Sequence, residues 1–171
     1  MSEQRQRQVT ERHLKYRAQV LRGCFEGILG LDEKARDMAL RETSRRCLAN
    51  VVERAGFDPR KINDIDEFIE AWSKAFPGRR NIQRVGDLLQ WQFNPPTTGA
   101  PCPCPFVRDG VIEPSPKLCL CSANWVRHLV EMVTKKPVQV DLIESPLTTG
   151  ADACRFVVHL KPPLFSSTGS P

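Results

Sequence analysis

The chain lacks the features that mark several large classes of protein. It has no apolar run near the ~18 residues that a bilayer-spanning helix needs. Residues 1–9 are polar and show no apolar core of a secretory signal. Its cysteines are about 4% of the residues, well below the roughly 8–10% of disulfide scaffolds. We therefore expect a cytoplasmic protein with reduced thiols and no membrane partner.

Common catalytic signatures are missing as well. The sequence contains no glycine-rich phosphate loop, no His-Glu-x-x-His and no Gly-x-Ser-x-Gly. The carboxylates of the second half show no spacing typical of paired acid–base catalysis. These absences exclude nucleotide hydrolysis and serine or metalloprotease chemistry as first hypotheses.

Positive charge is modest and gathers near the N-terminus. The net charge is +5, and the first 22 residues hold six basic and two acidic side chains. A nucleic-acid-binding protein usually shows a longer basic stripe, often with interleaved aromatic residues. These basic residues lie along a predicted helix with an apolar face, so a solvated helix face is favoured. A nucleic-acid adaptor is the weaker interpretation, and it predicts binding that falls steeply with salt.

The first half predicts three helices. Apolar residues recur at helical spacing over 9–29. A second helix is predicted between an Asp32 cap and Gly56. A third begins at Asp64 or Asp66 and closes at Pro77-Gly78.

The second half predicts strands around one helix. Alternation over 89–93 indicates a strand, and seven of the fourteen prolines at 95–116 argue against regular structure there. A short strand or hairpin is expected at 106–112, and Ser122 should cap an amphipathic helix. Strands at 138–142 and 154–160 should form a hairpin in which Cys154 faces inward.

These elements predict an α+β fold, in which N-terminal helices pack on a small antiparallel sheet with a C-terminal helix and β-hairpin. We expect one domain over 1–161, divided into a helical half (9–78) and a cysteine-rich sheet half (88–161). Residues 162–171 form a tail rich in proline and serine, for which we predict disorder.

Cysteine spacing is the least random feature of the chain. Five of the seven cysteines fall in one third of the sequence, four of them in Cys-x-Cys pairs: Cys102, Cys104, Cys119, Cys121 and Cys154. Clustered thiols predict a metal centre, with zinc as the expected ion, although Cys-x-Cys is tighter than the usual zinc spacing. Reactive or redox thiols and unligated small apolar residues are the alternatives. Cys24 and Cys47 lie on apolar helical faces and should serve as core residues.

Two of these cysteines lie at the predicted start of a helix, where the ionised form of a thiol is favoured. Cys119 and Cys121 precede the predicted Ser122 cap, where unpaired N–H groups should lower the pKa of both thiols. His128 lies about two turns into that helix, so Cys121 or Cys119 with His128 are the candidate catalytic groups. An imidazole whose bonds are satisfied elsewhere is the commoner role for such a histidine.

Residues 118–160 carry a resemblance to known families. A cysteine before the helix, here Cys119 or Cys121, is followed by a hairpin with Gly150, Cys154 and Phe156. This run resembles the C-terminal half of 4-vinyl reductase-type small-molecule-binding domains. It is also similar to bacterial L-2-amino-thiazoline-4-carboxylic acid hydrolase-like proteins. Pro146 stands where the first family usually has a further cysteine.

The resemblance implies helices against an antiparallel sheet, with an apolar pocket for a small organic ligand. We therefore expect a sensory or ligand-carrying domain whose zinc-binding cysteine cluster lies beside a pocket for a small apolar or heterocyclic ligand. The alternative is a thiol- or zinc-dependent hydrolase of a small cyclic amide or thiazoline-type substrate. A homodimer through the N-terminal helices is also expected, because an amphipathic terminal helix needs a partner surface.

Overall fold

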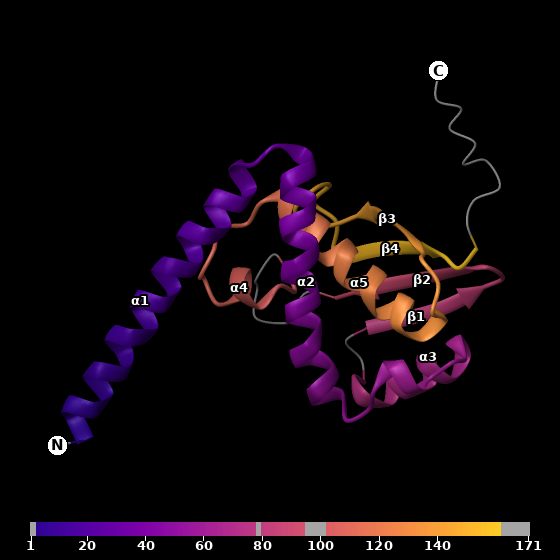
Figure 1. Ribbon diagram of the computed structural model, residues 1–171, viewed down its shortest axis with the longest axis horizontal. Helices are drawn as coiled ribbons and strands as arrows, with labels where there is room; N and C mark the ends of the chain where they lie inside the picture. The colour runs from indigo at the N-terminus through magenta and orange to yellow at the C-terminus, as the bar shows by residue number, and fades with distance from the viewer. Residues whose placement is uncertain (1–2, 78–79, 95–101, 162–171) are drawn as a thin grey trace.

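The computed structural model describes residues 3–77, 80–94 and 102–161, with side chains for all of these except 3–9 and 80. The predicted disordered tail lies outside the described residues. The fold is α+β, as expected (Figure 1). Its elements, in chain order, are α1 (Glu3–Gly30), α2 (Glu33–Ala55), η1 (Pro59–Lys61), α3 (Ile65–Ala75), β1 (Arg80–Val85), β2 (Leu88–Phe93), α4 (Pro105–Arg108), η2 (Pro116–Leu118), α5 (Cys119–Thr134), β3 (Gln139–Glu144) and β4 (Cys154–His159).

Local capping chemistry sets the ends of the first helices, as the sequence predicts. The Asp32 carboxylate accepts a hydrogen bond from the Ala35 N–H at 3.0 Å and starts α2. Gly56, with φ of 73°, ends α2 in the left-handed conformation that favours glycine. Asp64 accepts from the N–H groups of Asp66 and Glu67 at the start of α3.

The strands form one antiparallel sheet in the order β1-β2-β4-β3. Gly86, with φ of 60°, makes the two-residue turn between β1 and β2. The sequence analysis missed β1, because Ile82 is the one residue of 81–85 that is buried. A slipped register between Leu142 and Glu144 puts a bulge in β3.

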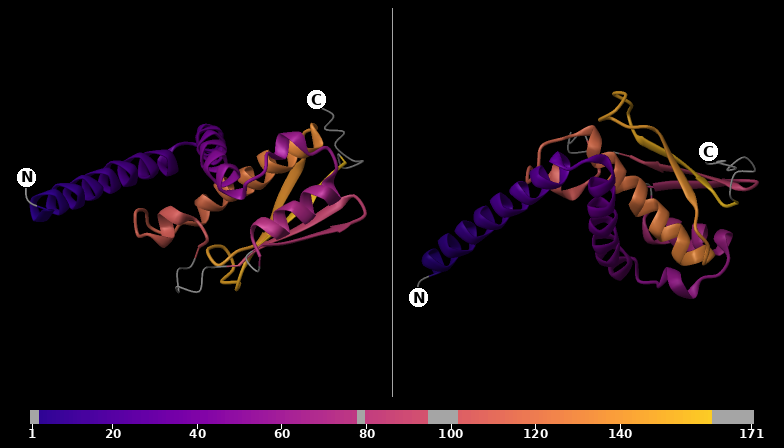
Figure 2. Two further views of the ribbon diagram at one scale, coloured as in Figure 1. Left: turned by 90° about the horizontal axis from the view of Figure 1, so that it is seen from below. Right: turned by 45° about the horizontal axis from the view of Figure 1, so that its top comes forward.

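The helices α3 and α5 cover one face of the sheet, α2 packs against α5, and no described helix covers the other face (Figure 2). Along β4, Cys154, Phe156 and Val158 are buried, whereas the alternating residues are half-exposed. The sheet therefore buries a single face, as the alternation over 154–160 predicts.

Two sequence predictions in the proline-rich segment are wrong. Residues 105–108 form the short helix α4 instead of part of a hairpin, since Pro105 at the first position already has the helical φ. The long helix begins at Cys119 and not after Ser122, because the turn that starts at Pro116 runs directly into it. Cys119 and Cys121 therefore lie in the first turn of α5.

The main core lies between these helices and the sheet. Its centre is a group of tilted and edge-on aromatic rings with centroids 4.6–6.4 Å apart. Phe68 of α3 is fully buried there, 6.1 Å from the ring of Trp91 and 5.6 Å from that of Trp72. A smaller cluster, which includes Phe25, Cys102 and Val107, joins the end of α1 to α4.

Truncating the central ring tests this packing. We expect Phe68→Ala to lower the free energy of unfolding by about 3–5 kcal/mol, because it removes a fully buried ring and leaves a cavity. The exposed Met38→Ala should change it by less than about 0.5 kcal/mol. Urea unfolding followed by tryptophan fluorescence measures both, and equal effects would contradict the proposed core.

Candidate functional site

Three segments bring the five clustered cysteines into one region. Cys102 and Cys104 come directly before α4, and Cys119 and Cys121 lie in the first turn of α5. Cys154 is the first residue of β4 and pairs with Phe93 of β2. All seven cysteines of the chain are free thiols.

The buried Cys102 lies at the centre of this group. If ionised, its sulfur would repel the ionised sulfurs of all four others, which are Cys104, Cys119, Cys121 and Cys154. Residues separated by up to 52 positions in the sequence therefore have neighbouring thiols. We call this group of five residues the cysteine cluster.

The predicted metal centre would use these same five cysteines. Within the described part of the chain, no three His, Cys, Asp or Glu side chains are placed to hold one metal ion together. Tetrahedral zinc needs four ligands with sulfurs at about 2.3 Å from the metal. Zinc binding by the cysteine cluster stays a prediction, which metal analysis of the purified protein would test.

The prediction that the helix start lowers the thiol pKa values is wrong. Burial raises the pKa of Cys121 to about 12, and the nearby Cys104 sulfur adds to this. Burial also raises the pKa of Cys119, partly offset by the Ser145 hydroxyl. Desolvation of the thiolate is the largest cause of the raised pKa at both positions. The thiols of the cluster are neutral at neutral pH.

His128 does not activate a cysteine. Its Nε2 lies 3.2 Å from the Arg41 carbonyl oxygen of α2, and its Nδ1 lies 3.9 Å from the Glu131 carboxylate. Seven residues along a helix separate it from Cys121 by about 10 Å of rise. The candidate catalytic groups therefore do not form a thiol–imidazole pair, and His128 instead joins α5 to α2.

A recess of about 190 Å³ opens beside the cysteine cluster, between α2, α5 and β3. Its lining includes Cys119 and Leu120 from the first turn of α5 and the side chains of Val140 and Leu142 from β3. The Cys119 Sγ lies 3.3 Å from the hydroxyl of the fully buried Ser145. The recess therefore combines an apolar wall with one neutral, hydrogen-bonded thiol.

Polar groups line the opposite side of the recess. The Asn124 amide donates to the Asp37 carboxylate at 3.1 Å, which holds the pKa of Asp37 below its ordinary value. The Arg127 guanidinium donates to the Asn124 side-chain oxygen at 2.8 Å. Asn124 is almost fully buried, so this chain of bonds also ties α5 to α2. The recess therefore has one apolar side and one polar side, which suits an amphiphilic ligand.

The remaining cysteines differ from each other. Cys24 is exposed, so its predicted core role is wrong, whereas Cys47 is half-buried against the main core, as predicted. Cys47 also lies within electrostatic reach of Cys121. The sequence analysis did not identify Ser145 or Asn124. A serine that directly follows a strand was the one available signal for Ser145.

In the segments that the structure describes, no helix is both long and apolar enough to cross a membrane. Neither a known protein family nor a curated protein matches the sequence. Among solved structures, the chain is similar to a trafficking protein particle complex subunit 3 from Naegleria fowleri, crystallised with covalently bound palmitic acid. The two share 15% identity with a TM-score of 0.50 over 86% of this chain and 97% of that one. At this identity the likeness shows the fold alone.

The buried thiols predict a pH dependence of stability. In the unfolded chain they ionise near their ordinary pKa of 9.0, whereas folding raises the pKa of Cys102 to about 11 and that of Cys154 to about 12. The stabilisation that these neutral thiols give the folded state is complete below pH 9. It is lost as the pH rises through the pKa values of the folded protein. Each thiol can remove up to about 1.4 kcal/mol per pH unit in that window.

Urea unfolding between about pH 8 and pH 10.5 should therefore show a falling free energy of unfolding. Cys154→Ala should reduce the slope, and the exposed Cys24→Ala should leave it unchanged. The interpretation is wrong if the two variants have the same slope.

Proposed function

We propose that this chain is a small-molecule-binding domain that holds an apolar or amphiphilic organic ligand in the recess beside the cysteine cluster. The observation that carries the proposal is the position of Cys119, a buried thiol that lines the recess next to Leu120 and Leu142. An uncharged thiol behaves as a small apolar group and favours an apolar part of a ligand. The Arg127 side of the recess favours a polar end.

The size of the recess restricts the ligand. Its volume of about 190 Å³ is below the ~300–1,000 Å³ of typical ligand pockets. The recess matches a small heterocycle, or one segment of a longer chain whose remainder lies outside it. Both agree with the small apolar or heterocyclic ligand that the sequence predicts.

Two likenesses support this choice of ligand class. The trafficking complex subunit that shares the fold carries palmitic acid on a covalent bond. Residues 118–160 also resemble 4-vinyl reductase-type small-molecule-binding domains. A fatty acid is therefore the first ligand to test, and Cys119 is the first thiol to test for an acyl thioester.

The hydrolase alternative has no supporting geometry. Burial raises the pKa of both candidate nucleophiles, Cys119 and Cys121, so both stay protonated. His128 is bonded to the Arg41 carbonyl and to no cysteine among the contacts of the described residues. A thiol nucleophile needs a lowered pKa or an adjacent base, and neither is found.

Filling the recess tests ligand binding. We expect the full chain to bind cis-parinaric acid, a fluorescent C18 fatty acid, and Leu120→Trp to weaken binding by at least about tenfold. Leu120 is 37% exposed and lines the recess, so a larger side chain fills the space without entering the core. Leu88→Trp on β2, where the leucine is 36% exposed, is the matched control and should retain the affinity.

A fluorescence titration gives each affinity, and near-ultraviolet circular dichroism confirms that both variants are folded. Equal affinities of the two variants would rule out this recess as the site. Intact mass after incubation with palmitoyl-coenzyme A, whose coenzyme A thiol leaves as the acyl group is transferred, then separates the two modes of binding. A palmitoyl adduct that disappears in Cys119→Ala is covalent, whereas unmodified protein with retained affinity means reversible binding.

A further inference from the structure

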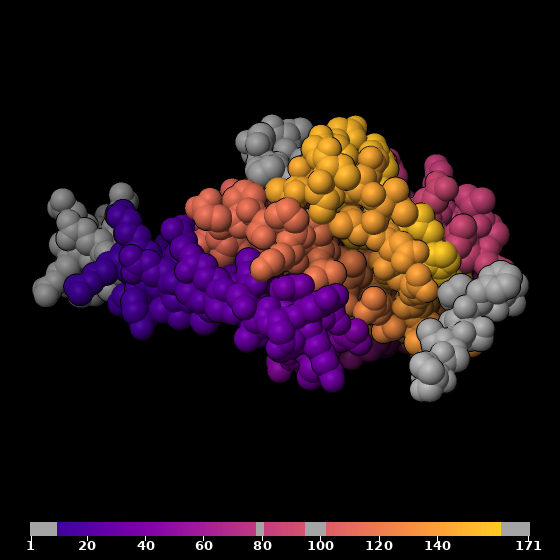
Figure 3. Space-filling view, turned by 90° about the horizontal axis from the view of Figure 1, so that it is seen from above, coloured from indigo at the N-terminus to yellow at the C-terminus, as the bar shows by residue number. Residues whose placement is uncertain are grey.

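The helix α1 leaves the body of the protein and is attached by its C-terminal end (Figures 1 and 3). Phe25 is buried in the smaller cluster, with its ring 5.3 Å from that of Phe106. The Arg22 guanidinium donates to the carbonyl oxygens of Val111 and Gly110, both at 3.1 Å. The preceding turns extend beyond these contacts, so their side chains are largely exposed.

One face of α1 points away from this attachment. Residues that recur every three or four positions share a helix face, and Tyr16, Val20, Gly23 and Gly27 follow this spacing. Tyr16 and Phe25 are nine positions apart, which places them on opposite sides at about 100° per residue. Tyr16 is 65% and Val20 is 46% exposed. We call the surface of Arg12, Tyr16, Val20, Gly23 and Gly27 the outer face of α1.

Among the residues that the structure describes, no contact requires the two glycines of this face. A Cβ atom built at Gly23 or Gly27 would meet nothing within 4 Å, and neither residue has a positive φ. Each glycine costs a helix interior about 1 kcal/mol relative to alanine. Close approach of another backbone is the usual reason for a glycine that the local conformation does not need.

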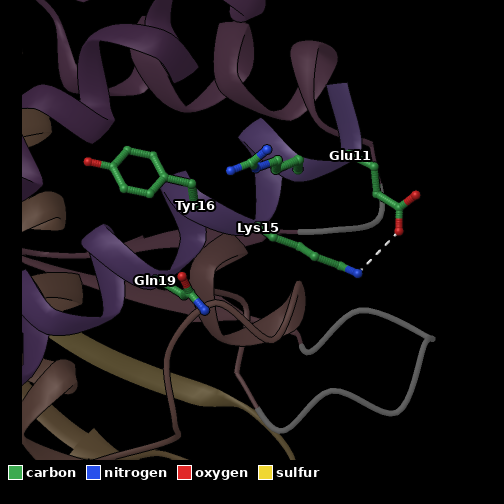
Figure 4. Close-up of a pocket in the computed structure, with 5 residues that line it drawn as sticks. Glu11, Lys15, Tyr16 and Gln19 are labelled. Carbon is green, nitrogen blue, oxygen red and sulfur yellow. Dashed lines mark ion pairs between the residues drawn. The ribbon is translucent and has the colours of Figure 1, made fainter. Parts of the chain in front are cut away.

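The charged residues along α1 restrict which partner can bind to its outer face. A hollow of about 450 Å³ runs along α1, and its described lining comes from that helix alone (Figure 4). Lys15, Tyr16 and Gln19 border it, and Arg12 adds a second positive charge. Glu11 is the one acidic group of this lining, and it pairs with Lys15 at 3.3 Å. The excess of positive charge favours an acidic partner.

We propose that the outer face of α1 docks an acidic amphipathic helix of a partner protein. Apolar side chains of that helix cover Tyr16 and Val20, its backbone passes close to Gly23 and Gly27, and its carboxylates meet Arg12. The spacing of the exposed apolar residues is that of helix–helix packing.

Two other occupants fit the observations less well. A helix that lies on a bilayer needs a face rich in large apolar side chains, whereas the outer face of α1 combines Tyr16 and Val20 with two glycines. A second copy of this chain, as in the predicted homodimer, would bring like charges together in a parallel pair. An acidic partner avoids both difficulties.

The probe is a synthetic helical peptide with leucine at heptad positions a and d and glutamate at e and g. Its control has lysine at e and g. Fluorescence anisotropy with the full chain should show that the glutamate peptide binds at least about tenfold more tightly and weakens with salt. Arg12→Glu with Lys15→Glu should abolish the preference. The double variant Lys34→Glu and Lys136→Glu changes the net charge equally at exposed sites elsewhere and should leave it intact.

Gly23→Leu separates docking from folding. It should block the glutamate peptide while the melting temperature stays equal or rises, since the added side chain meets nothing in the chain and favours the helix. Equal binding of the two peptides, or unchanged binding by Gly23→Leu, would overturn the proposal. Self-association in sedimentation equilibrium that Gly23→Leu abolishes would identify a second copy instead. Binding to anionic vesicles without peptide binding would identify a lipid surface.

Discussion

The packing of α5 between α2 and the sheet is the interaction on which the candidate site depends. Val126, Leu129 and Val130 are completely buried against the main core, and α5 contacts α2, α3 and β3. Burying such side chains contributes about 1.5–3 kcal/mol each. This packing orients the first turn of α5, so that Cys119 lies near Cys154 at the start of β4. The site is therefore a consequence of how the helix is buried.

Elements with strong local signals could be predicted from the sequence. Asp32, Asp64 and Gly56 identify helix ends because capping depends on neighbouring residues alone. The alternation from Cys154 to Val158 identifies a strand and its inner face. The strand β1 was not predicted, because its own sequence shows little alternation of apolar and polar residues. Pairing with β2 across the two-residue turn at Gly86 decides its conformation, and a search for apolar alternation does not register such pairing.

The cysteines of the candidate site could be predicted from the sequence, whereas their pKa shifts and their contacts could not. Spacing in the sequence pointed to five cysteines, and the fold does bring them together. The sign of the pKa shift at Cys119 and Cys121 was wrong, because the depth of burial cannot be known before the fold. Ser145 and Asn124 were not identified for the same reason, since their contacts come from elements distant in the chain. Local chemistry thus predicts which residues matter, and tertiary packing determines what they can do.

The bulge in β3 affects how readily the protein can aggregate through its exposed edge strand. An edge strand offers unpaired N–H and C=O groups to any other extended chain, and β3 is such an edge, with Ile143 exposed on it. The shifted register between Leu142 and Glu144 interrupts the regular row of donors and acceptors at that residue. A neighbouring nascent chain therefore finds no straight template there, which protects the molecule from aggregation by strand addition.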